Sequence, residues 1–193
     1  MAVAAPERLY FTPSDEANEL IARDPLALLI GFALDQQVTV PQAFTGPQKL
    51  KERLGSLDAA VIAHMDPDRL EGAFREKPAV HRFPGAMATR VRDLAAHVEE
   101  EYSGEASRLW VETGDSAELR RRIAALPGFG EMKIKALSAV LYKRFGVEAA
   151  RELTPDHPTL GDVDSPEALQ RYQAAKRAYK QGGTWDAATM AAP

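Results

Sequence analysis

Hydrophobic residues recur along most of this chain at the three- and four-residue intervals of a helix, and no segment keeps the alternation of a half-buried strand. Val91, Leu94, Ala95 and Val98 show this spacing. Residues 26–34 are apolar throughout, which fits a buried helix but falls short of the roughly 18 residues that a membrane span needs. We therefore predict an all-α fold of about ten helices.

Local sequence signals mark where these helices begin and end. Asp24-Pro25 and Asp66-Pro67 each place an N-cap residue before a proline that suits the first helical position. Gly146 suits the position just after a helix end. Together such signals predict helices over about residues 14–23, 25–38, 41–55, 58–64, 66–74, 86–102, 115–126, 131–145 and 165–180, with residues 150–164 irregular.

The length of 193 residues allows one large domain or two small ones. We see no internal repeat, and we expect a single helical domain over residues 1–181. Within it, residues 116–145 form a helical hairpin. The Ala-, Gly- and Thr-rich residues 182–193 are expected to form a flexible tail.

The composition excludes several chemistries. The chain has no cysteine, which rules out disulfides, thiolate zinc sites, iron–sulfur clusters and cysteine nucleophiles. Its four histidines show no metal-binding spacing, so we predict neither a metal nor another cofactor. No signal peptide is visible at the N-terminus, and the lack of cysteine suits a reducing cytoplasm.

The charge is unevenly distributed. The net charge of −4 excludes a uniformly basic nucleic-acid binder. Residues 119–145 nevertheless carry seven basic side chains against Glu131 alone, and residues 77–92 and 168–185 are basic without any acid. Residues 93–118 are acidic. Ordinary solvated helix faces explain each segment singly, whereas the three together favour one positive face for a polyanion.

The sequence Leu126-Pro-Gly-Phe-Gly130 lies between two predicted amphipathic helices. Its two glycines allow a tight turn and expose backbone N–H groups at the start of the second helix, which is a favourable place for an anion. Lys133 and Lys135 follow within two turns. The combination suits a phosphate, although an ordinary helical hairpin with a glycine turn would have the same sequence.

This turn resembles the Leu-Pro-Gly-Val-Gly hairpin of the helix-hairpin-helix (HhH-GPD) superfamily of base-excision DNA glycosylases. Residues 28–39 resemble the early helix of the same superfamily, which ends in a Gln-Gln pair. The two matches lie about 90 residues apart, in the order and at the spacing of the superfamily. The helix from Pro84 to Leu94 also resembles a segment of the superfamily. In that segment, a helix that bears a Lys or Arg joins the two lobes. The resemblance covers residues 14–181 and is nearest to a compact bacterial branch that lacks the iron–sulfur cluster.

The resemblance implies a two-lobed helical fold with an interlobe cleft, and it implies roles for individual residues. Gln36 and Gln37 would fill the gap left by a flipped nucleotide. The turn and the helix after it would contact DNA through Gly128, Phe129, Gly130, Lys133 and Lys135.

The chain departs from the superfamily at two functional positions. Met132 stands where bifunctional members carry a Schiff-base lysine. Lys133 is the next residue, and one residue along a helix is a rotation of about 100°, so its side chain should not reach the same pocket. We therefore expect no lyase step. The usual Val-Asp-Thr-His motif of the catalytic aspartate is also missing. Three aspartates lie in the corresponding region, and they are Asp162, which is expected to have no capping role, Asp164 and Asp156.

The leading hypothesis is a monofunctional DNA glycosylase that acts as a monomer on duplex DNA with a damaged base, in the cytoplasm at the nucleoid. The missing lysine favours an alkylated base over an oxidised pyrimidine. The alternatives are a non-catalytic DNA-binding or lesion-sensing protein and, more remotely, a helical interaction scaffold without a DNA role.

Overall fold

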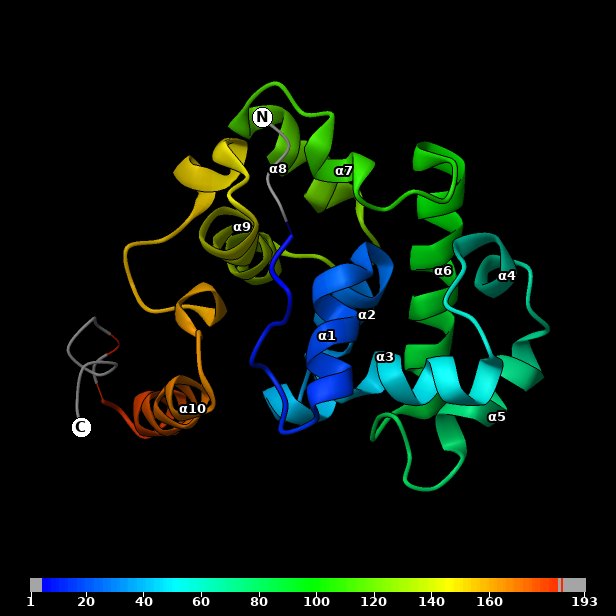
Figure 1. The fold of residues 1–193 in the computed structure, drawn as a ribbon. Helices are drawn as coiled ribbons and strands as arrows, with labels where there is room; N and C mark the ends of the chain where they lie inside the picture. Colours follow the sequence, from blue (N-terminus) through cyan, green and yellow to red (C-terminus); the bar gives the residue numbers. More distant parts are fainter. Residues whose placement is uncertain (1–4, 184, 186–193) are drawn as a thin grey trace.

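The computed structural model describes residues 5–183 and 185, and this part of the chain forms helices and no strands (Figure 1). The prediction of an all-α protein is confirmed. The helices are α1 (Asp15–Arg23), α2 (Pro25–Leu34), α3 (Val40–Leu54), α4 (Ala59–Ala63), α5 (Pro67–Arg75), α6 (Pro84–Tyr102), α7 (Arg108–Val111), α8 (Ser116–Ala125), α9 (Glu131–Phe145), the 3₁₀ helices η1 (Glu148–Leu153) and η2 (Leu160–Asp162), and α10 (Pro166–Lys180).

Helix α2 lies at the centre of the core. Every residue from Leu26 to Leu34 is buried, so the helix has no solvent face. The Asp24 side chain caps it by accepting hydrogen bonds from the N–H groups of Leu26 and Ala27. Helices α1, α3 and α6 pack around it. An apolar helix of this kind is stable only when other elements enclose it, and this explains its central place.

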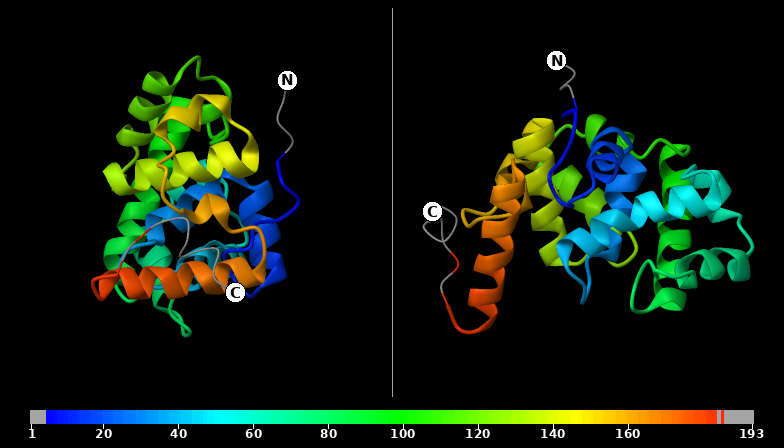
Figure 2. Two further views of the ribbon diagram at one scale, coloured as in Figure 1. Left: turned by 90° about the vertical axis from the view of Figure 1, so that its left-hand side faces the viewer. Right: turned by 60° about the horizontal axis from the view of Figure 1, so that its bottom comes forward.

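The remaining helices lie on two sides of α2. Helices α3 to α6 form one group, and α8, α9 and α10 lie on the opposite side (Figure 1). Figure 2 shows α10 at the outer edge, beyond α9 as seen from α2. No helix in the described residues has the length and apolar character needed to cross a membrane. Most of the predicted flexible tail, namely residue 184 and residues 186–193, lies outside the described residues.

Two predictions of helix extent were wrong, and one short helix was not predicted. Helix α2 ends at Leu34 instead of residue 38, because the polar residues Asp35, Gln36 and Gln37 cannot share its buried surroundings. Residues 150–164 were predicted to be irregular but include η2 and most of η1. The one-turn helix α7 was not predicted, because four residues are too few to show a helical period.

Helices α2 and α3 approach each other closely at Gly31. A Cβ at this position would overlap the ring of Phe44, which is fully buried and packs edge-on against Phe11 and Phe32. The absence of a side chain at Gly31 therefore sets the separation of the two helices.

We predict that Gly31→Ala lowers the free energy of unfolding by about 1–3 kcal/mol, because Phe44 must shift in a fully packed core. Gly72→Ala is the matched control within α5, where a Cβ would meet no atom within 4 Å. That variant should gain about 0.5–1 kcal/mol, because alanine favours the helix. Urea unfolding of both variants measures the difference, and equal effects would refute the close-packing argument.

Candidate functional site

The turn between α8 and α9 contains two glycines. The backbone conformation requires a glycine at the first position but not at the second. Gly128 has a φ of +78°, in the left-handed region that favours glycine. The N–H of Phe129 donates to the carbonyl of Leu126, and both side chains are buried. Gly130 has an extended backbone that any residue could adopt, and a Cβ there would meet open space. The hairpin thus holds itself together and leaves Gly130 exposed.

The amino end of α9 is open to an anion. Gly130 is its N-cap and supplies no side-chain hydrogen bond. The N–H groups of Gly130, Glu131 and Met132 have no acceptor among the described residues, and the Met132 side chain is 77% exposed. The acidic Glu131 also lies in this first turn, but Arg120 donates two hydrogen bonds to its carboxylate. Donors and the positive helix end therefore remain available.

Arg90 of α6 connects this turn to the loop after α2. A Cβ at Gly128 would lie 2.8 Å from Nε of Arg90, so the guanidinium packs directly on the turn. Nη1 of Arg90 also donates to the side-chain oxygen of Gln36. Residues from three distant parts of the sequence thus meet at one guanidinium. Two of them, Gln36 and Gly128, were predicted to contact DNA.

The loop that carries Gln36 and Gln37 is fixed from beneath by His81. The buried His81 ring accepts a hydrogen bond at Nδ1 from the N–H of Phe83, so Nε2 carries the proton and donates to the carbonyl of Gln36 over 3.0 Å. Burial lowers the pKa of His81, and the hydrogen bond to the Gln36 carbonyl only partly opposes this. Gln37 is exposed at the end of the loop with a φ of +56°, which is rare for a non-glycine residue.

Lys133 points inward, and Lys135 does not. Nζ of Lys133 donates to the carbonyl of Ala33 over 3.1 Å, at the carboxyl end of α2, and lies 5.5 Å from the ring centre of Phe129. Burial lowers the pKa of Lys133 to about 8; repulsion from Arg90 adds to this, and attraction to Asp35 opposes it. Lys135 is largely exposed and lies 3.9 Å from the Glu131 carboxylate.

Asp35 lies at the same end of α2 and is half-buried. Burial raises the pKa of Asp35 despite the positive charges of Lys176, Lys133 and Lys180 nearby. The buried Tyr172 of α10 lies within reach of the same carboxylate; burial raises the pKa of its hydroxyl, and the negative charges of Asp35 and Asp162 raise it further. The charges of Asp35 and Lys133 thus act on each other, and the charge of Asp35 also acts on Tyr172; we call these three residues the polar cluster.

Asp162 has a capping role, and the spacing of Thr159-Leu-Gly-Asp162 in the sequence is that of a capping box. Its carboxylate accepts from the N–H and the hydroxyl of Thr159 in a capping box around η2, and Lys143 donates to both of its oxygens over 2.7 and 2.9 Å. Burial works to raise the pKa of Asp162, but these hydrogen bonds outweigh it and hold the pKa below its usual value. The expectation that Asp162 lacks a capping role was therefore wrong.

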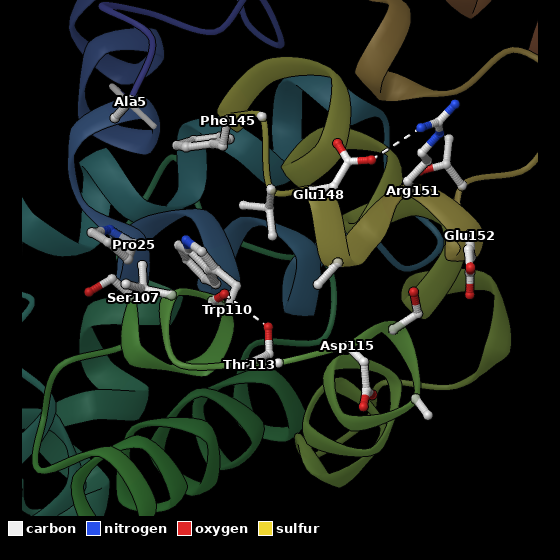
Figure 3. A pocket seen from close by; sticks show the side chains of 18 of the residues that line it. Ala5, Pro25, Ser107, Trp110, Thr113, Asp115, Phe145, Glu148, Arg151 and Glu152 are labelled. Carbon is white, nitrogen blue, oxygen red and sulfur yellow. Dashed lines mark hydrogen bonds and ion pairs between the residues drawn. The ribbon is translucent and has the colours of Figure 1, made fainter. Parts of the chain in front are cut away.

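The other two predicted aspartates lie elsewhere. Asp164 is exposed, and its neighbour Ser165 caps α10. Asp156 lines an open groove of about 1250 Å³ between η1, α7 and the start of α8 (Figure 3). The groove also contacts Phe145 at the far end of α9, about 21 Å along the helix from the turn. The structure does not bring Asp156 near Gln36 or Gly130.

Much of the positive charge of residues 119–145 is neutralised locally. Arg120 and Lys135 lie against Glu131, Arg121 and Arg122 against Glu118, and Lys143 against Asp162. Arg122 also donates to the backbone carbonyls of Arg108 and Glu112 and so fastens α8 to α7. The seven basic residues of this segment therefore do not form one uncompensated positive face.

Among the described residues, no three His, Asp or Glu side chains are grouped so that they could hold a metal ion. Comparisons of the chain with models of protein families, with curated proteins and with solved structures find no match. Evidence on function therefore comes from the residues of this chain alone.

Sequence reasoning missed Asp35 and Tyr172 as members of the cluster. Asp35 was identifiable as an acid between a buried apolar helix and the Gln-Gln pair. Tyr172 gave no signal, because an aromatic residue on an amphipathic helix is usually core and its neighbours come from distant segments.

We predict that His81 titrates below the ordinary histidine pKa of about 6.5, and that its neutral form stabilises the fold. This contribution is present above pH 6.5 and is lost as the pH falls through the pKa of the folded state, since a proton on Nδ1 would oppose the Phe83 N–H. NMR titration of the imidazole signals measures the pKa. A measured pKa for His81 at or above 6.5 would contradict the assignment.

Proposed function

We propose that this protein is a monofunctional DNA glycosylase of base-excision repair. It binds duplex DNA that contains a damaged base, flips the damaged nucleotide and hydrolyses the N-glycosidic bond. The proposal rests mainly on the junction at Arg90, whose guanidinium contacts both the Gln36 side chain and the turn at Gly128. An open helix start and an amide-bearing loop are thereby held beside one another, as a protein that grips a phosphate next to a flipped nucleotide requires.

In this proposal the groups α3–α6 and α8–α10 are the two lobes of an HhH-GPD fold, and the Arg90 junction lies in the cleft between them. The N–H groups at the start of α9 hold a phosphate, while the exposed basic residues of α10 add charge. Gln37 is exposed at the end of its loop and enters the duplex, while Gln36 is held by Arg90. The protein acts as a monomer at the nucleoid.

Bond breakage leaves positive charge on the sugar, which a nearby carboxylate stabilises while it orients a water molecule. Of the three predicted aspartates, Asp162 is the one whose charge reaches Tyr172 in the cluster. The exposed Met132 replaces the lysine that a lyase would need, and Lys133 donates to the Ala33 carbonyl. Both observations favour simple hydrolysis.

A non-catalytic lesion-binding protein is the second candidate. It is favoured by the engagement of Asp162 with Lys143 and Thr159, which accounts for that carboxylate without any catalytic role. Base release distinguishes the two candidates.

We predict that Gly130→Val weakens binding to duplex DNA by about ten-fold or more without unfolding the protein. A Cβ at Gly130 meets no protein atom, so the fold should persist, whereas the added methyl groups keep a phosphate from the N–H donors. Fluorescence anisotropy with labelled duplex at two salt concentrations gives the affinity, and circular dichroism gives the fold.

Gly114→Val is the matched control, since Gly114 lies beside the opposite end of α8 and a Cβ there makes only an ordinary contact with Glu118. Equal DNA affinities of the two folded variants would remove the hairpin from the DNA interface.

We further predict that the protein releases a free base from at least one duplex in a panel with uracil, hypoxanthine, 3-methyladenine, 1-methyladenine or 8-oxoguanine. The strand should stay intact until alkali is added, and borohydride should trap little covalent complex, because no lysine occupies the lyase position. Efficient trapping that disappears in Lys133→Ala would show a lyase. Absence of base release from every duplex, with binding retained, would support the non-catalytic candidate.

A further inference from the structure

We infer that Asp35 is a catalytic carboxylate of this protein, acting on the sugar of the flipped nucleotide. The inference rests on the proposed glycosylase function and names a residue outside the segment where the sequence places the catalytic aspartate.

The position of Asp35 ties it to the proposed DNA contacts. It is followed directly by Gln36, which Arg90 joins to the turn at Gly128. Lys133, whose ammonium group is hydrogen-bonded at the same end of α2, lies only three residues beyond Gly130, or less than one turn of α9. Asp162 lies by contrast against Lys143, near the far end of α9. A nucleotide next to a phosphate at Gly130 is thus nearer to Asp35 than to Asp162.

Asp35 has no structural role that would account for a buried charge. In the described part of the chain no group donates a hydrogen bond to its carboxylate, whereas Asp162 receives hydrogen bonds from two residues. A carboxylate at the carboxyl end of a helix also faces the negative end of the helix dipole. A half-buried acid in such a place costs stability, and proteins retain unfavourable groups of this kind chiefly at functional sites.

The surroundings keep Asp35 available for chemistry. The positive charges of Lys133 on α9 and of Lys176 and Lys180 on α10 act on Asp35, and the negative charge of Asp35 acts on the buried Tyr172. Burial raises the pKa of Asp35 and so makes the carboxylate more basic, and the positive charges of Lys176, Lys133 and Lys180 oppose this rise. A desolvated anion of this kind stabilises a neighbouring positive charge better than a hydrated one does.

The reaction is a hydrolysis. The bond between C1′ and the base nitrogen breaks, and its electron pair leaves with the base, so that positive charge develops on the sugar next to the Asp35 carboxylate. Water attacks C1′ and forms the new C–O bond, and its proton passes to Asp35. Asp35 then returns the proton to solvent or to the departed base, and an abasic sugar and a free base remain.

The test compares Asp35→Asn with Asp164→Asn, the exposed matched control, and with Asp162→Asn. Single-turnover base release is measured on the duplex from the panel that the wild-type protein cleaves fastest. Affinity is measured on a duplex with a tetrahydrofuran abasic-site analogue. We expect Asp35→Asn to slow release by about 100-fold or more, to bind the analogue as tightly as wild type or more tightly, and to unfold at the same or a higher temperature.

Asp35→Glu is the second variant, and it should recover part of the lost rate because it restores the carboxylate. Release by Asp35→Asn within about three-fold of wild type would overturn the role of Asp35 and leave the glycosylase proposal intact. A large loss of base-release rate in Asp162→Asn alone would also overturn the role of Asp35 and leave the glycosylase proposal intact. If the wild-type protein releases no base although it binds the analogue, the proposed function fails, and the catalytic role of Asp35 fails with it.

Discussion

The structure depends on the burial of one apolar helix. Because α2 has no polar face, the other helices must enclose it, and the chain can leave the core only where α2 ends. That end brings Asp35, Gln36 and Gln37 beside the start of α9. The carbonyl of Ala33 would lack an α-helical partner there, and Lys133 supplies one. The meeting of a helix carboxyl end with a helix amino end therefore builds the candidate site as a consequence of packing.

Arg90 and His81 then fix the geometry of this junction. Arg90 reaches across from α6 to Gln36 and Gly128, while the neutral His81 holds the Gln36 backbone. With much of the positive charge of α8 and α9 engaged in ion pairs, attraction to a polyanion must come from backbone N–H groups and from cations that lack such pairs. In the proposed function an acidic protein can still hold a phosphate, since binding relies on local donors more than on net charge.

The sequence predicted the helical class and most helix boundaries well, because caps and hydrophobic spacing are local signals. The Asp24 and Asp66 caps and the helix end at Gly146 all lie where they were expected. The sequence predicted the site less well. The end of α2 was placed four residues late, since periodicity continues past the point where burial ends. The partners of Asp35 and Lys133 come largely from distant segments, as does Lys143, which pairs with Asp162, so no local pattern encodes these contacts.

The charges of Asp35 and Asp162 both act on Tyr172, and the surroundings of these two carboxylates shift their own pKa values in opposite directions. Hydrogen bonds from Lys143 and Thr159 lower the pKa of Asp162, whereas burial without a hydrogen-bond donor raises that of Asp35. A carboxylate whose lone pairs are already committed to donors is a weak base and a poor partner for a new positive charge, because each donor would have to be given up or shared. One that is desolvated and uncommitted retains its full capacity for both tasks. The same comparison explains why the aspartate with the clearer structural role is the weaker candidate for chemistry, although its place in the sequence is nearer to the one expected.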